Sequence, residues 1–319
     1  MLLSKEPGKS FSAPPKMDLL YKDLTLHEET ASYRVYEAEA NNSSQEKHLI
    51  RILDPSKDLV DKDFDSAATL FIQELFHLEN RCPGTVLIGT LEICRDRKQI
   101  ACALRKHSLM NLQLGSIDLR NPNVIKELIS DVLSDVKFLR SELLMENIAS
   151  IVEPENMFYL KIPTEDKEET KEETEERDYF YLTHWEKILQ QGVGDTTTRR
   201  TAGSKLTSQD LAAEIRALAF ALLKIKQVDL KELKFPLANI EYAKQAYESS
   251  VKSQVAKGFS DLPEIQDLIE RMLSFDPKNF PSLEELIIGN TDSMSVILLY
   301  MLSSLCVIHL RLNKTLKLD

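Results

Sequence analysis

Apolar residues recur at helical spacing along several segments of the chain. In residues 123–141 they are three or four positions apart: Val124, Leu128, Val132, Val136 and Leu139. This spacing places them on one face of an α-helix, so the segment is predicted to be an amphipathic helix. The same reasoning predicts helices over residues 65–80 and 209–226.

Short runs of aromatic, aliphatic and β-branched residues between polar turns predict β-strands. These runs cover residues 48–54, 86–94, 99–104, 157–160 and 179–182. Residues 26–38 are predicted to form a further β-hairpin. Together, the helices and strands predict a protein of the α+β class.

The composition is that of an ordinary globular protein with ample material for a core. Hydrophobic residues make up 43% of the 319 positions and charged residues 29%. The net charge of −11 argues against nucleic acid or an anionic membrane as the main partner. Residues 164–178 hold nine acidic and three basic side chains and therefore supply most of this charge. We expect them to form the solvated tip of a hairpin, with an acidic docking segment as the alternative.

Both ends of the chain and its cysteines bear on the compartment. The four cysteines form no CxxC pair, which favours reduced cysteines in a cytoplasmic protein. Residues 1–20 are predicted to be a disordered leader, because residues 1–16 lack the apolar run of a signal peptide. Residues 294–310 are nearly uncharged but short for a membrane span. A terminal helix docked on the protein is expected there, and a membrane tail anchor is the alternative.

Three motifs, in this order, resemble those of eukaryotic protein kinases. Residues 152–157 (Val-Glu-Pro-Glu-Asn-Met) lie between a helix and a strand, as does the catalytic loop H-R-D-x-x-x-x-N. Residues 214–219 (Glu-Ile-Arg-Ala-Leu-Ala) resemble the helix S-D-x-W-x-L-G, with Arg216 at the Trp position. Residues 273–282 resemble the ending L-x-x-D-P-x-x-R-P-S of a late helix, with Phe280 at the Arg position.

The resemblance implies a bilobal protein-kinase-like fold. A small β-rich N-lobe would span residues 21–104, and a larger helical C-lobe would span residues 105–290 and include the acidic insert 164–178. Residues 291–319 would add an apolar C-terminal helix and a short tail. An unrelated α+β adaptor with similar spacing is the alternative.

The resemblance also identifies catalytic residues that this chain lacks. Asn156 matches the magnesium-binding Asn of the catalytic loop, but Ile151 stands at the position of the catalytic Asp. His184, in His-Trp-Glu, stands at the position of the magnesium-binding Asp of D-F-G, and we expect it to be an interior or rim histidine rather than a metal ligand. The glycine positions of the phosphate-binding loop are also replaced, by Glu28, Thr30 and Tyr33. No catalytic residue and no metal site are therefore expected.

The nucleotide-pocket candidates come from the same resemblance: Val35, Arg51, Glu74, Leu104 and Asn156. Arg51 replaces the lysine of V-A-I-K, and Glu74 matches the glutamate of the helix that follows. An Arg51–Glu74 ion pair is predicted from this match. Leu104 directly precedes the expected hinge.

A chain without either aspartate is expected to transfer almost no phosphoryl group. Catalytic groups that act together depend on one another, so the loss of several leaves little of the rate. The sequence therefore predicts a pseudokinase, a scaffold or allosteric binding module whose partners are proteins, an active kinase among the candidates. No cofactor is expected, although ATP binding without Mg²⁺ stays open. The alternative is a weakly active or atypical ATP-dependent serine/threonine kinase in which Glu153 is the least implausible substitute base, ahead of Asp178 and Glu155.

Overall fold

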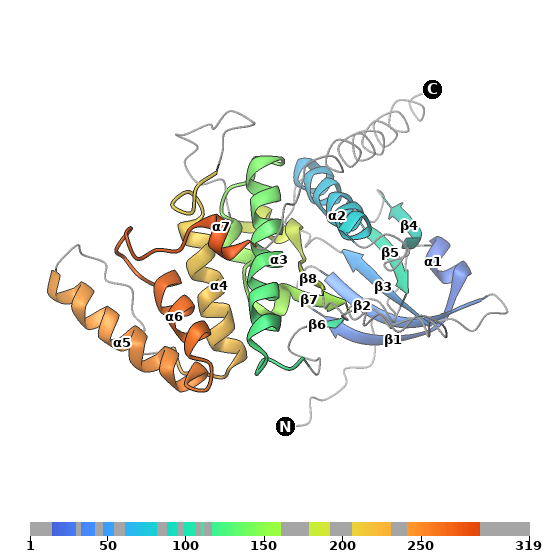
Figure 1. The fold of residues 1–319 in the computed structure, drawn as a ribbon. Coiled ribbons are helices and arrows are strands. Elements are labelled where there is room, and N and C mark those ends of the chain that lie inside the picture. Colours follow the sequence, from blue (N-terminus) through green and yellow to red (C-terminus); the bar gives the residue numbers. More distant parts are fainter. Residues whose placement is uncertain are drawn as a thin grey trace, which may run out of the picture. The chain divides into compact units, whose positions relative to one another are not determined.

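The computed structural model describes most of the chain in eleven segments. They are residues 15–29, 33–41, 47–53, 61–81, 88–94, 99–105, 110–111, 117–160, 179–191, 206–230 and 241–287. The chain divides into two compact units, the first formed by Met1–Thr69 and Leu75–Ser108 and the second by Leu70–Glu74 and Leu109–Asp319. Both contain helices and strands (Figure 1), so the predicted α+β class is confirmed.

The first unit is built on a five-stranded antiparallel sheet. Its strands are β1 (Tyr21–Glu29), β2 (Tyr33–Ala40), β3 (Lys47–Leu53), β4 (Ile88–Cys94) and β5 (Gln99–Arg105). Their spatial order is β1-β2-β3-β5-β4. β1 and β2 pair as the predicted hairpin, and β3, β4 and β5 occupy the other predicted strands of this region.

Alternation along the strands separates the sheet into two faces. One face carries an apolar cluster to which β2, β3 and β5 each contribute every second residue: Tyr36, Ala38, Ala40, Ile50, Ile52, Ala101 and Ala103. Helix α1 (Pro15–Leu20) adds the fully buried Met17 to this cluster. The sequence pattern of the strands thus decides which face receives the helix.

Helix α1 corrects the prediction of a disordered leader over residues 1–20. Met17 is buried, and its backbone N–H donates to the Glu92 carboxylate on β4 at 3.1 Å. Asn41 also holds the end of the helix, because its side-chain amide donates to the Leu19 carbonyl at 2.9 Å. A single apolar anchor with two polar contacts therefore orders residues that have no helical periodicity of their own. Residues 1–14 lie outside the described part of the chain.

Helix α2 (Asp61–Arg81) confirms the helix predicted over residues 65–80 and begins earlier. Most of it belongs to the first unit, whereas its middle turn, Leu70–Glu74, groups with the second.

The second unit combines a small sheet with most of the helices. The sheet consists of β6 (Met110–Asn111), β7 (Met157–Leu160) and β8 (Tyr179–Leu182), in that order. The α-helices are α3 (Pro122–Ser141), α4 (Ala212–Ile225), α5 (Glu241–Phe259), α6 (Pro263–Met272) and α7 (Leu283–Leu286). Three short 3-10 helices complete it: η1 (Ile148–Ile151), η2 (Pro154–Asn156) and η3 (Trp185–Gln191).

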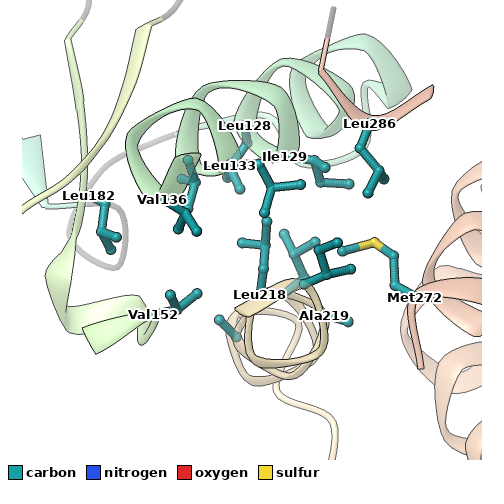
Figure 2. Close-up of a cluster of buried hydrophobic side chains, with 14 of the residues drawn as sticks. Leu128, Ile129, Leu133, Val136, Val152, Leu182, Leu218, Ala219, Met272 and Leu286 are labelled. Atoms are coloured by element: carbon teal, nitrogen blue, oxygen red, sulfur yellow. The ribbon is translucent and has the colours of Figure 1, made fainter. Parts of the chain in front are cut away.

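The core of the second unit lies between α3 and α4. Figure 2 shows Leu128, Leu133 and Val136 of α3 pointing toward Leu218 of α4, all of them fully buried. The predicted apolar stripe of α3 therefore faces the core. Local sequence also fixes where this helix begins, because Pro122 occupies its first turn and the Asn121 side chain accepts from the Asn123 backbone N–H.

The two runs predicted to flank the acidic segment do pair as antiparallel strands, β7 and β8. The acidic segment itself, residues 164–178, lies outside the described residues, as does the apolar run 294–310. Within the described part of the chain, the search for a helix long and apolar enough to cross a membrane finds none.

Candidate functional site

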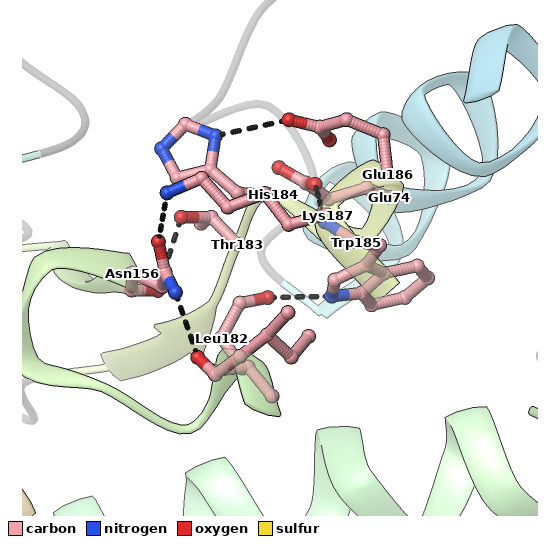
Figure 3. Close-up of polar contacts among 9 residues, drawn as sticks. Glu74, Asn156, Leu182, Thr183, His184, Trp185, Glu186 and Lys187 are labelled. Carbon is pink, nitrogen blue, oxygen red and sulfur yellow. Dashed lines mark hydrogen bonds and ion pairs between the residues drawn. The ribbon is translucent and has the colours of Figure 1, made fainter. Parts of the chain in front are cut away.

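The described residues around Asn156 form a buried polar cluster in the second unit, which we call the Asn156 cluster (Figure 3). It comprises Glu74, Asn156, Thr183, His184, Trp185, Glu186 and Lys187. The loop before β7 supplies Asn156, and the segment that runs from the end of β8 into η3 supplies Thr183 to Lys187. Pairing of β7 with β8 brings these two segments side by side, with Met157 opposite Leu182.

The local sequence explains the shape of the loop before β7. Asn147 adopts a left-handed conformation with φ 58°, which asparagine tolerates better than most residues. Its carbonyl accepts from the backbone N–H and the hydroxyl of Ser150, which closes the turn of η1. Pro154 then starts η2 with its fixed φ.

Asn156 connects three parts of the backbone. Its side-chain amide Nδ2 donates to the Ile151 carbonyl at 2.9 Å, back across the loop. Its own carbonyl accepts from both the backbone N–H and the hydroxyl of Thr183, at 2.8 and 3.0 Å. The Lys187 ammonium donates to its Oδ1 at 2.6 Å. The bonds to Ile151 and Thr183 are buried, and the bond from Lys187 is partly buried.

His184, for which the sequence predicts an interior or rim position, is fully buried. Its Nδ1 lies 3.5 Å from Oε1 of Glu186, which is also buried, and its ring packs edge-on against Phe158 at 5.8 Å between centroids. The backbone of His184 is left-handed, with φ 63°. A non-glycine residue in this region carries strain, which the surrounding contacts must outweigh.

Trp185 ties η3 to the middle turn of α2. Its backbone N–H donates to the Glu74 carboxylate at 3.0 Å, and its indole N–H donates to the Leu182 carbonyl at 2.7 Å. The ring is fully buried next to Phe138 of α3. The single tryptophan of the chain therefore has both of its N–H groups satisfied inside the second unit.

Two aspartates of α3 hold strand β8 in place. Asp131 and Asp135 are both buried, and they accept from the backbone N–H groups of Phe180 and Leu182 at 3.0 and 2.8 Å. They are four residues apart and therefore lie on one face of the helix, while their partners are two residues apart and share one edge of the strand. β8 is an edge strand of the three-stranded sheet, and the two carboxylates accept the backbone N–H groups of its outer edge.

Ile151, at the position predicted to replace a catalytic aspartate, belongs to the apolar core and is 1% exposed. Its carbonyl is the acceptor for Asn156, so only its backbone takes part in the polar cluster. No acid–base group can act from this position.

In the first unit, three of the predicted nucleotide-pocket residues share one face of the sheet. Val35 lies opposite Arg51 in the β2–β3 pair, and Arg51 lies opposite Cys102 in the β3–β5 pair. Leu104 follows Cys102 by two residues and therefore points to the same side. Val35, Arg51 and Leu104 are all buried.

The other two predicted residues, Glu74 and Asn156, belong to the second unit. They are connected through η3, whose residues Trp185 and Lys187 contact one each. Arg51 and Glu74 fall in different units, and their ion pair stays a prediction.

Several contacts of the second unit were not predicted from the sequence. One is the contact between Lys187 and Asn156. Its only signal in the sequence is a single cation close to the apolar residues Trp185, Ile188 and Leu189. Another is the ion pair between Glu153, directly before η2, and Lys224 of α4.

Arg216 of α4 also makes contacts that the sequence did not predict. Its guanidinium lies 5.5 Å from the ring centroid of Phe275 and 5.2 Å from that of Phe280, and it donates to the Ser274 carbonyl at 3.2 Å. Burial lowers the pKa of Arg216 and raises that of the neighbouring Tyr247. The same helix buries Glu214, whose carboxylate lies 3.7 Å from the Arg140 guanidinium; burial raises the pKa of this carboxyl.

A surface cavity of about 360 Å³ lies elsewhere in the second unit. Its lining comes from α3, α6 and α7, with Ile129, Leu268 and Leu286 as apolar members and Lys126 and Arg271 as basic ones. Both cations are paired with acidic residues, Lys126 with Glu264 and Arg271 with Glu285. The cavity includes no residue of the Asn156 cluster.

The hydrogen bonds of the Asn156 cluster join its side chains to one another and to backbone groups of Ile151 and Leu182. Among the described residues, no group of three or more His, Cys, Asp or Glu side chains is arranged to hold a metal ion. No model of a known protein family matches the chain, and a comparison with curated proteins finds no similar sequence.

Proposed function

We propose that the chain is a degenerate member of the protein-kinase-like superfamily, with a bilobal fold, and that it acts as a binding or scaffolding module without phosphotransferase activity. The order of elements supports the fold: an antiparallel sheet with a helix between β3 and β4, then a long helix, a polar loop, a β-hairpin and a set of helices. This order agrees with the order of the kinase-like motifs in the sequence.

One observation carries the proposal of inactivity. Ile151 occupies the proposed position of the catalytic base and is buried in the apolar core. A carboxylate could act there only if it reached the substrate hydroxyl, and a buried isoleucine supplies neither the group nor the access.

A contact between two replaced positions supports the kinase-like assignment. By the resemblance, position 216 would carry a tryptophan and position 280 an arginine. Here Arg216 and Phe280 occupy these positions, and the guanidinium lies over the ring. A cation–π contact thus joins the two replaced positions, which brings together residues that the resemblance assigns to two separate motifs.

The weakly active kinase is less well supported. Glu153 was the least implausible substitute for the missing base, but its carboxylate forms an ion pair with Lys224 of α4. The contact therefore engages this carboxylate with Lys224 rather than with a substrate hydroxyl.

The test is a phosphoryl-transfer assay on the purified full chain. With radiolabelled ATP, Mg²⁺ or Mn²⁺ and general protein substrates, we expect no more label on protein than with an Ile151→Ala variant. A thermal shift with ATP, with and without Mg²⁺, should show no metal-dependent stabilisation. Transfer of label that Arg51→Ala abolishes would overturn the proposal and favour the enzyme.

A further inference from the structure

We propose that the Lys187 ammonium is a resident cation at Asn156, which holds the Asn156 cluster in one conformation without a metal ion or a bound nucleotide. The proposal rests on hydrogen bonds of the second unit alone. It does not depend on the proposed function, although it explains how an inactive module would keep a fixed shape.

The first step is the orientation of the Asn156 side chain. The Lys187 ammonium carries only donors, so the atom it contacts at 2.6 Å must be the amide oxygen. The Ile151 carbonyl carries only acceptors, so the atom at 2.9 Å from it must be the amide nitrogen. The two ends of the amide are therefore fixed independently, and each assignment requires the other.

The second step concerns what else Asn156 could bind. The amide oxygen is the only atom of this side chain that could coordinate a hard cation such as Mg²⁺. Lys187 already directs a full positive charge at this oxygen from hydrogen-bonding distance. A divalent ion on the same oxygen would lie within a few ångströms of the ammonium, in a partly buried site where repulsion is weakly screened.

His184 stands where the resemblance implies a second metal ligand, but it is fully buried with its Nδ1 facing Glu186. In the part of the chain that the structure describes, no three or more His, Cys, Asp or Glu side chains are grouped so that they could hold a metal ion. The described residues near Asn156 therefore do not fit the metal site that the kinase resemblance implies.

The third step is the effect on the backbone. Lys187 lies in η3, and Asn156 lies at the end of η2, so their contact joins two segments that the β7–β8 hairpin only brings close. Asn156 is also bonded through its carbonyl to Thr183. The Lys187 and Thr183 hydrogen bonds to Asn156, together with the chain from Thr183 to Lys187, thus form a closed ring after the end of β8 (Figure 3).

The experiment measures amide hydrogen exchange in the full chain. The reporters are the Thr183 N–H, which donates to Asn156, and the Asn156 N–H, which donates to Glu153. The variant Lys187→Met keeps the length of the side chain and removes its charge. The control Lys224→Met removes another lysine of the same unit, whose partner is Glu153 rather than Asn156.

In the wild-type protein, we expect millimolar Mg²⁺ or Mn²⁺ to leave exchange at both reporters unchanged. In Lys187→Met, exchange at Thr183 should rise by about tenfold or more, because one charge-assisted bond of the set is lost. Lys224→Met should change it by less than about threefold, as expected for a partly exposed ion pair.

Two results would overturn the proposal. One is slower exchange in the wild type when Mg²⁺ or Mn²⁺ is added, which needs no variant and so remains decisive if Lys187→Met fails to fold. The other is exchange in Lys187→Met that equals that of the wild type. Both results are read from amide exchange without ATP, whereas the proposed function is tested by label transferred to protein, so failure here is distinguishable from failure of the proposed function.

Discussion

Ile151 and His184 stand at the two positions where the kinase resemblance implies catalytic aspartates, and the second unit buries both of them. Ile151 is 1% exposed and His184 is completely buried. Their surroundings differ, however. Ile151 is surrounded by apolar side chains and has an ordinary backbone, whereas His184 faces Glu186 and adopts a left-handed φ of 63°.

This difference shows two physical routes by which the protein accommodates a buried residue. At Ile151, burial of apolar surface stabilises the fold and leaves no polar group to satisfy. At His184, burial of a polar ring is unfavourable by itself, and the ring lies between the Glu186 carboxylate, 3.5 Å from its Nδ1, and the Phe158 ring. The first route should resist changes of pH and depend on volume, while the second should depend on individual polar partners.

The largest expected effect comes from introducing a carboxylate at Ile151, the apolar position. Ile151→Asp buries a charge without a partner and should lower the free energy of unfolding by about 3–5 kcal/mol. Ile151→Val, the control, should lower it by about 0.5–1.5 kcal/mol because only a methylene is lost. Urea denaturation of the full chain measures both. A stable Ile151→Asp protein would mean that the position is not closed by apolar packing.

A smaller loss of unfolding free energy is expected where a buried polar group loses its hydrogen-bond partner. Asp135→Ala removes the acceptor of the Leu182 N–H and should lower the free energy of unfolding by about 1–3 kcal/mol, because a buried donor loses its partner. Asp135→Asn keeps an oxygen acceptor and should cost less, as measured by the same denaturation. Equal losses for the two variants would show that hydrogen bonding to β8 is not what Asp135 contributes.

Much of the fold was predictable because helical and strand periodicity directly reflect which face is buried. Helix α3 is an example, since its apolar stripe is the side that packs on α4. Helix α5 was not predicted. Among the side chains of α5 that the structure describes, from residue 246 on, the buried apolar ones are Tyr247, Val251, Val255 and Phe259, with polar residues between them. The segment therefore lacks the apolar density of α4.

The candidate site was predictable only in part. The resemblance implies that Asn156 and His184 belong to one site. The sequence leaves an interior and a rim position open for His184, and the structure shows the interior one. Lys187 could not be assigned, since its contact with Asn156 joins residues 31 positions apart and depends on the exact pairing of β7 with β8. Sequence patterns predict helices and strands, whereas a contact such as that of Lys187 with Asn156 depends on the register in which two strands pair.

The backbone of His184 offers a sharper test of the comparison. Alanine normally stabilises a protein relative to glycine, but a left-handed φ reverses this order. We therefore expect His184→Gly to be more stable than His184→Ala by about 1 kcal/mol in thermal or urea unfolding. At Ile151, where φ is not positive, the same pair of substitutions should follow the normal order. Alanine as the better residue at both positions would contradict a strained His184.

The smallest expected effect is a change in the pH dependence of the free energy of unfolding, caused by the burial of the Glu214 carboxyl. Burial raises the pKa of the Glu214 carboxyl above its ordinary value of 4.5, although a backbone hydrogen bond and Arg140 oppose the shift. The folded protein therefore holds this proton more tightly than the unfolded chain does. The resulting stabilisation is fully present below pH 4.5 and is lost as the pH rises through the folded pKa.

Glu214→Gln removes this dependence, so the advantage of the wild type over the variant should shrink as the pH rises from about 4 to about 8. Glu285 provides a control of opposite sign, because its hydrogen bond to Arg271 lowers its pKa below 4.5. Its stabilisation is present above pH 4.5 and is lost as the pH falls through the folded pKa, so Glu285→Gln should differ most from the wild type at neutral pH. Chemical denaturation across this range measures both differences. Each variant gives a slope, the change with pH in its difference in unfolding free energy from the wild type. Burial is what distinguishes the predicted response of Glu214 from that of Glu285, an ion-paired surface carboxylate. Slopes of the same sign for the two variants would therefore mean that burial does not govern the proton affinity of Glu214.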